Sequence, residues 1–130
     1  MEDANKNVII TEAAREKICK ARAGEIKLPK IIGMAFGDGG TDSSGNIIPP
    51  ADGQSGLTNE LLRKEIDGYS FINKTACRYT CTLSENELAN TYISELGLYD
   101  EDGDLVCIKT FMRKGKDDDL EMAFEIDDVF

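Results

Sequence analysis

An acidic turn between two apolar runs, at residues 92–111, constrains the fold of this chain more than any other feature. The turn contains the dipeptide Asp102-Gly103. This dipeptide between two β-prone runs favours a β-hairpin, because a primed turn requires positive φ angles, which Asp and Gly tolerate. The flanking apolar residues are Ile93, Leu96, Leu98 and Tyr99 before the turn and Leu105, Val106, Ile108 and Phe111 after it. We therefore predict a hairpin with Asp102 and Gly103 as its structural turn.

Three other segments have the character of β-strands. Residues 75–83 and 120–127 alternate apolar and polar side chains, as a strand with one buried face does. The predicted inward residues are Cys77, Tyr79, Cys81 and Leu83 in the first and Leu120, Met122, Phe124 and Ile126 in the second. Residues 30–36 form a third predicted strand, in which Gly33 weakens the strand or marks a close backbone approach.

The first predicted helix covers residues 12–23. Thr11 precedes it as an N-cap, and Gly24 follows in the position usual for a C-terminal cap. Its narrow apolar stripe consists of Ala14, Ile18 and Ala21. A stripe rich in alanine suits a helix that covers a sheet rather than one that forms a core. Residues 1–7, before this helix, are expected to fray.

A second helix is predicted over residues 58–66. Thr58 can cap it, Leu57 and Leu62 occupy the two positions of a hydrophobic staple, and Gly68 ends it. The element order is then helix, strand, long loop, helix and four locally joined strands. This order predicts an α+β fold, a mainly antiparallel β-sheet or sandwich with two helices packed against it, in a single domain over residues 1–130.

The balance of charges argues against two classes of partner. The chain carries 15 basic and 25 acidic side chains, which gives a formal net charge of −10. Nucleic acids and anionic membrane surfaces attract basic proteins, so neither is an expected partner. No apolar stretch approaches the ~20 residues of a membrane span, and the polar N-terminus predicts no signal peptide. The charge therefore serves solubility or docking on a basic partner surface.

The four cysteines are predicted to be reduced thiols. Cys77 and Cys81 lie on one predicted strand with Cα atoms ~13 Å apart, which is too far for a disulfide. Neither these two nor Cys19 and Cys107 have the spacing of a zinc site, and the chain contains no histidine. We therefore expect a protein made in the cytoplasm, with no metal and no other cofactor.

Residues 37–56 form a long loop by composition. An irregular segment of this length in a compact domain usually serves a purpose. A phosphate-binding loop does not fit, because neither a Gly-Lys-Ser/Thr sequence nor the dinucleotide-binding glycine spacing is present. Two interpretations stay open. The residues Gly37, Asp38, Gly39 and Gly40 form a partner-facing loop, or the whole loop lines a site for a small ligand or carbohydrate in a binding domain.

The acidic segments match neither a calcium site nor an active site. In residues 100–104 the glycine comes too early for an EF-hand loop, and the twelfth position counted from Asp100 is Phe111. Residues 117–119 could likewise hold a cation, but an acidic turn after Lys114 and Lys116 explains them without one. Without histidine, catalysis would need a carboxylate pair, a lysine or a cysteine, and no spacing singles one out. We therefore predict no catalytic or metal-binding residues and no enzymatic activity.

Three segments, taken in order, resemble the N-terminal domain of phage tail-collar fibre proteins, which stands at the head of P2-like tail fibres. They are Lys30-Ile-Ile-Gly-Met-Ala-Phe-Gly-Asp-Gly-Gly40, Leu57-Thr-Asn-Glu-Leu-Leu-Arg63 and Ile93-Ser-Glu-Leu-Gly-Leu-Tyr-Asp-Glu-Asp-Gly-Asp-Leu-Val106. The family pattern has a Gly-Asp-Gly loop, a Leu-x-x-Glu-x-x-Arg helix and a Glu-x-Gly-Leu-[Phe/Tyr]-Asp-x-Asp-Gly hairpin. The resemblance extends over most of the chain.

The resemblance implies a structural assembly module of a phage or prophage tail, which attaches a tail fibre or collar component to the baseplate. The implied partners are other tail or baseplate proteins, and the implied location is the bacterial cytoplasm during assembly and then the virion tail. Because the chain stops before a fibre shaft and tip, we expect a free-standing component or an adaptor for a separate fibre. Its solvated strand faces and its charge predict a monomer or weak oligomer in dilute solution, with homo-oligomers formed only on assembly.

Overall fold

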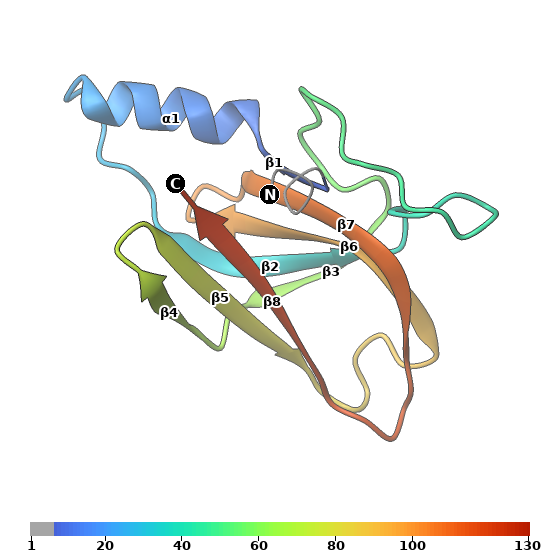
Figure 1. Cartoon of the computed structure of the whole chain (residues 1–130). Helices are drawn as coiled ribbons and strands as arrows, with labels where there is room; N and C mark the ends of the chain where they lie inside the picture. Colours follow the sequence, from blue (N-terminus) through green and yellow to red (C-terminus); the bar gives the residue numbers. More distant parts are fainter. Residues whose placement is uncertain (1–6) are drawn as a thin grey trace.

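The structure, a computed structural model, describes residues 7–130 and contains two antiparallel β-sheets packed face to face (Figure 1). Along the chain its elements are β1 (Val8–Ile10), α1 (Glu12–Arg22), β2 (Ile31–Gly37), β3 (Glu60–Glu65), β4 (Gly68–Asn73), β5 (Ala76–Leu83), β6 (Thr91–Asp100), β7 (Leu105–Lys116) and β8 (Met122–Val129). The five-stranded sheet has the order β1-β7-β6-β2-β3, and the three-stranded sheet has the order β4-β5-β8. The helix α1 lies across one end of the sandwich (Figure 1).

The helix α1 forms where the sequence predicts the first helix. The Thr11 hydroxyl accepts a hydrogen bond from the Ala14 N–H at 3.2 Å, and Gly24 follows the helix with a φ of +82°. No helix within residues 7–130 is long and apolar enough to cross a membrane. Residues 1–6 of the segment expected to fray lie outside the described residues. The carbonyl of Asn7 accepts a hydrogen bond from the Thr110 N–H at 2.9 Å.

Strands β6 and β7 form the hairpin at residues 92–111. The Gly103 N–H donates to the Asp100 carbonyl at 2.9 Å, and Gly103 has a φ of +88°. Asp102 does not have a positive φ. A primed turn would need a positive φ at Asp102, so the connection is instead a type I turn followed by a left-handed glycine. Gly103 therefore supplies the one left-handed position that this turn requires.

The prediction of a second helix over residues 58–66 is wrong, and the α+β fold with two helices is wrong with it. These residues contain β3, which pairs antiparallel with the edge of β2. Leu62 and Ile66 are four positions apart, a spacing that keeps residues on one face of a helix and of a strand alike. Isolated helices shorter than ~12–15 residues are marginal, whereas β3 gains main-chain hydrogen bonds from β2. Within residues 7–130 the fold is a β-sandwich with one helix.

The strands β1 and β4 are also not predicted from the sequence. Strand β1 pairs with β7 and places Ile9 opposite Ile108. Strand β4 pairs with β5 and places Tyr69 opposite Tyr79. Each of these strands lies at an edge of its sheet, so it has a neighbour on one side only. Neither shows the alternation of polar and apolar residues on which the strand predictions rest.

The main core lies between the two sheets. Its buried members are Met34, Phe36, Cys81, Leu83, Ile93, Leu96, Leu98, Cys107, Phe124 and Ile126. The rings of Phe36 and Phe124 meet edge to face across the sandwich, with centroids 5.3 Å apart. A second cluster of Ala35, Leu105 and Ile108 is joined by the partly buried Leu57, which follows the long loop. Strand β6 is consequently buried over six successive residues, 93–98, on both of its faces.

Candidate functional site

A buried carboxylate on β6 holds both ends of the long loop. The side chain of Glu95 has no solvent exposure. Its Oε2 atom accepts hydrogen bonds from the N–H groups of Gly39 and Asn59, and its Oε1 atom accepts one from the N–H of Thr58, each at 2.8 Å. Gly39 lies near the start of the loop, and Thr58 and Asn59 lie where it enters β3. We call this carboxylate with its three donors the Glu95 anchor.

Glycines at the start of the long loop let its backbone approach β6 closely. The N–H of Gly40 donates to the Ser94 hydroxyl at 2.8 Å. A Cβ atom added at Gly40 would lie 2.0 Å from the Ser94 carbonyl oxygen, and one added at Gly39 would lie 2.5 Å from the Thr58 Cβ atom. Atoms of a folded protein do not approach so closely, so any side chain at these positions would move the loop away from the strand.

The structure places the four residues of the predicted partner-facing loop mostly against the sheet. Gly37 and Gly40 are buried, and Gly39 is half-buried and bound to Glu95. Asp38 is the exposed member, and its carboxylate accepts a hydrogen bond from the Asn59 side chain at 2.7 Å. Gly39 and Gly40 thus hydrogen-bond to β6, and Asp38 is the most exposed of the four, so the partner-facing role stays a prediction.

Glu95 belongs to the family pattern, but the pattern gives it no role. One signal in the sequence could have identified it: a single carboxylate inside the apolar run Ile93-Ser-Glu-Leu-Gly-Leu98. A buried charge is tolerated only when it is paired or hydrogen-bonded, so this position indicates a set of donors nearby. The donors themselves could not be found, since Gly39 is 56 residues away along the chain.

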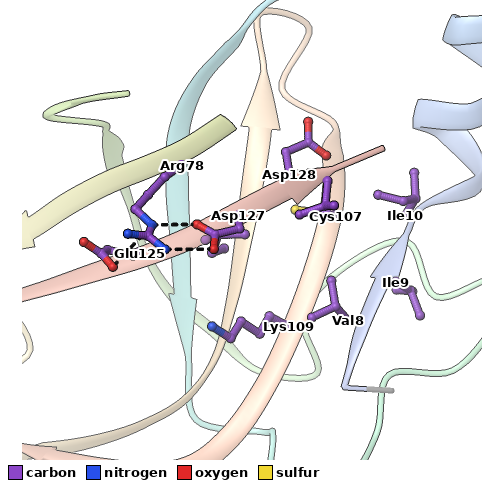
Figure 2. A pocket seen from close by; sticks show the side chains of 11 residues that line it. Val8, Ile9, Ile10, Arg78, Cys107, Lys109, Glu125, Asp127 and Asp128 are labelled. Atoms are coloured by element: carbon purple, nitrogen blue, oxygen red, sulfur yellow. Dashed lines mark hydrogen bonds and ion pairs between the residues drawn. The ribbon is translucent and has the colours of Figure 1, made fainter. Parts of the chain in front are cut away.

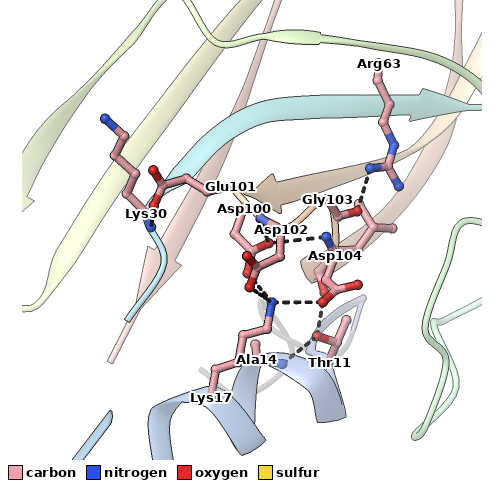
Figure 3. Close-up of polar contacts among 11 residues, drawn as sticks. Thr11, Ala14, Lys17, Lys30, Arg63, Asp100, Glu101, Asp102, Gly103 and Asp104 are labelled. Atoms are coloured by element: carbon pink, nitrogen blue, oxygen red, sulfur yellow. Dashed lines mark hydrogen bonds and ion pairs between the residues drawn. The ribbon is translucent and has the colours of Figure 1, made fainter. Parts of the chain in front are cut away.

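A second cluster joins α1 to the turn between β6 and β7 (Figure 3). The ammonium group of Lys17 lies 2.7 Å from Asp100, 3.0 Å from Asp102 and 2.8 Å from Asp104, measured from Nζ to a carboxylate oxygen. Asp100 is only 1% exposed, and it also accepts hydrogen bonds from the N–H groups of Asp102 and Asp104 at 3.0 and 3.2 Å. We call these four residues the Lys17 cluster.

The Lys17 cluster is the site at which three carboxylates could hold a metal ion. Their oxygens lie within 4.8 Å of one another. The Lys17 ammonium is placed among them and supplies the positive charge that a cation would otherwise supply. Burial opposes this charge, but the hydrogen bonds to Asp100, Asp104 and Asp102 outweigh burial and raise the pKa of Lys17 above its usual value. The predicted turn residue Asp102 thus takes part in an internal ion cluster.

Replacing Lys17 with Met should lower the free energy of unfolding by about 1–3 kcal/mol, because the buried Asp100 loses its counter-ion. Methionine keeps the apolar stem of the side chain. Since the pKa of Lys17 is raised, its contribution is complete below about pH 10.5 and is lost only as the pH rises through the higher folded-state value. Urea unfolding at pH 7 and pH 9 should therefore give equal losses. Lys20→Met is the control, since its partner Glu16 is exposed and such pairs stabilise little.

Two grooves at the surface of residues 7–130 are lined by residues outside the loop 37–56. The larger one, about 600 Å³, lies between β1, β7 and β8 (Figure 2). On its wall Arg78 donates two hydrogen bonds to Asp127, at 2.8 and 3.1 Å. Burial raises the pKa of the Cys107 thiol to about 12, so this thiol is protonated at neutral pH. Because residues 37–56 line neither groove, these grooves do not support the interpretation that the long loop lines a ligand site.

The Glu95 anchor and the Lys17 cluster thus characterise a structural protein. It is a β-sandwich in which the first holds the long loop, and the second holds α1, against the hairpin of β6 and β7. A sequence model of the phage tail-collar fibre proteins, for their N-terminal part, matches residues 3–124. The chain therefore belongs to the phage tail-collar fibre family. This membership gives it a structural role in a phage tail.

The chain is also similar to a probable tail fiber protein of Escherichia phage P2. The two are 32% identical over 101 residues, which cover 77% of this chain and 14% of that relative. The chain therefore spans about one seventh of the length of the curated relative that it matches. No solved structure matches the chain.

Proposed function

We propose that this chain attaches a tail fibre or collar component to the baseplate of a phage or prophage tail. The observation that carries the proposal is the family match, which covers residues 3–124 and is to the N-terminal part of the collar fibre proteins. An attachment module needs a fixed surface, because ordering mobile loops on binding reduces affinity. The Glu95 anchor and the Lys17 cluster supply that fixed geometry.

The charge of the chain supports a basic partner surface. A net charge of −10 on 130 residues attracts positively charged surfaces and accelerates their encounter. The same charge opposes contact between copies of the chain. In dilute solution the chain is a monomer or weak oligomer under this proposal, and it forms larger assemblies only on the baseplate.

Tails from the phage or prophage that encodes the chain provide the test. Deleting the gene should leave tails whose baseplates lack fibres in negative-stain electron micrographs, and supplying the gene in trans should restore the fibres. Mass spectrometry of restored tails should find the chain in the particle. Tails that carry their full set of fibres without this chain would contradict the attachment role.

A further inference from the structure

Strand β4 is an edge strand without charged side chains or proline, and its pairing with β5 is regular from Gly68 to Phe71, before a register shift between Phe71 and Asn73. Unpaired main-chain groups at a sheet edge can bind another chain, and proteins block them with charged side chains, proline or very short strands. The two sheets have four edges, formed by β1, β3, β4 and β8. Strand β1 has three residues, β3 has four charged residues, and β8 contains Glu125, Asp127 and Asp128. The sequence of β4, Gly-Tyr-Ser-Phe-Ile-Asn, contains neither charge nor proline.

The face of β4 that continues the core surface is also uncovered. Tyr69 lies directly opposite Tyr79, which packs against the main core, and Phe71 lies opposite Cys77. The rings of Tyr69 and Phe71 meet edge to face with centroids 5.9 Å apart. These two side chains are 63% and 73% exposed, although their register places them on the core-facing side of the sheet. At β4 the three-stranded sheet thus extends beyond the five-stranded sheet that covers the rest of this face.

The net charge of the chain indicates the chemistry of the β4 partner. The strand beside β4 carries one basic residue, Arg78, opposite Ser70, and the three acidic residues of this sheet lie on β8 at its other edge. The whole chain carries −10. Pairing of β4 with β4 of a second copy would bring two such chains together, so repulsion disfavours it. A segment rich in Lys or Arg is attracted instead.

We propose that the free edge of β4 binds an extended segment of another tail protein as a fourth strand of the three-stranded sheet. Main-chain hydrogen bonds to β4 hold the segment, as in other cases of strand addition. Because side chains of a strand alternate between its faces, every second residue of the segment is apolar and contacts Tyr69 or Phe71. The remaining positions carry net positive charge. This inference rests on the proposed attachment role, and it specifies the surface through which the chain binds its partner.

A selection from a library of random peptides tests the edge directly. The library consists of displayed peptides of about ten residues, long enough to cover a strand of usual length, and the target is the immobilised full chain. We expect enriched peptides to alternate apolar and polar residues, to lack central proline and to carry net positive charge. No enrichment over uncoated wells, or enrichment of peptides without this alternation, would overturn the proposal.

Two variants locate the binding site of the enriched peptides. Phe71→Lys places a charge on the apolar face of β4 and should weaken binding at least about tenfold, equivalent to ~1.4 kcal/mol. Met112→Lys, at an exposed apolar residue of β7, is the matched control and should leave the affinity within about twofold. Equal effects of the two variants would overturn the assignment to β4. Both are exposed positions, and circular dichroism verifies that each variant is folded.

Hydrogen exchange and light scattering complete the test. Bound peptide should slow exchange of main-chain N–H groups in residues 68–73, and unchanged exchange there would contradict strand addition. A dimer at micromolar concentration that Phe71→Lys dissociates would show that β4 pairs with its own copy, and would overturn the choice of occupant. Failure of the attachment role gives a different result: peptides bind β4, yet tails assemble their fibres without the chain. Failure of the β4 inference alone leaves fibre attachment intact in Phe71→Lys tails.

Discussion

Replacing Glu95 with Gln should lower the free energy of unfolding by about 2–4 kcal/mol, because hydrogen bonds to a charged acceptor contribute roughly 1.5–3 kcal/mol each. Glutamine has the same shape but a single acceptor oxygen. Either its NH2 group faces the N–H of Thr58, or it faces the N–H groups of Gly39 and Asn59. In both orientations a donor opposes a donor in a fully buried position, so at least one main-chain group loses its partner.

Thermal unfolding followed by circular dichroism measures this effect, and the midpoint should fall by roughly 10 °C. A local readout accompanies it. Thermolysin cuts beside large apolar residues, and residues 38–59 contain three of them, Ile47, Ile48 and Leu57, although they contain no Lys or Arg at which trypsin could cut. Because the loop of the variant is less firmly held, thermolysin should cut it sooner than the loop of the wild type. Glu121→Gln removes the same charge from an exposed residue and is the matched control. Equal midpoints for the two variants would contradict the Glu95 anchor.

The parts of the fold that the sequence predicts well depend on contacts close in the chain. The hairpin of β6 and β7 follows from the Asp-Gly turn between two apolar runs. The predicted strands at residues 75–83 and 120–127 agree with β5 and β8, because one face of each is buried and the alternation of side chains records this burial. Leu120 is an exception, since it precedes β8 and is exposed.

The parts that the sequence does not predict depend on distant partners. Residues 58–66 fit a helix by their end signals, and only the free edge of β2 and the carboxylate of Glu95 decide that they extend. Strand β4 has no alternation, because most of its side chains are exposed on either face. Only the register with β5 shows that its aromatic residues, Tyr69 and Phe71, lie on the core-facing side of the sheet.

The candidate site separates in the same way. The family pattern brings together the glycine loop and the acidic hairpin as sequence, but it does not reveal that Gly39 binds Glu95. Lys17 has no signal of its own in the sequence, because its partner Asp100 is 83 residues away. A buried carboxylate in an apolar run therefore indicates that another segment supplies hydrogen-bond donors to it. Which segment does so is known only from the fold.

Replacing Gly40 with Ala should have the largest effect of any single methyl group added to this chain, a loss of about 3–5 kcal/mol. The added Cβ atom would lie 2.0 Å from a main-chain oxygen of β6, and a main-chain atom cannot rotate away as the end of a side chain can. The loop must therefore move. Movement breaks the hydrogen bond from Gly40 to Ser94 and the one that Ile48 donates to the Gly40 carbonyl at 2.8 Å.

Gly56→Ala is the matched control for this loss, because it changes the same loop by the same methyl group. No atom lies within 4 Å of a Cβ atom at Gly56, and its φ is not in the left-handed region. Alanine there reduces the freedom of the unfolded chain, so the control should be neutral or more stable by roughly 0.4–1 kcal/mol. Urea unfolding curves should therefore place Gly40→Ala below the wild type and Gly56→Ala at or above it. A Gly40→Ala midpoint at or above that of Gly56→Ala would mean that the loop does not lie against β6 as closely as the structure has it.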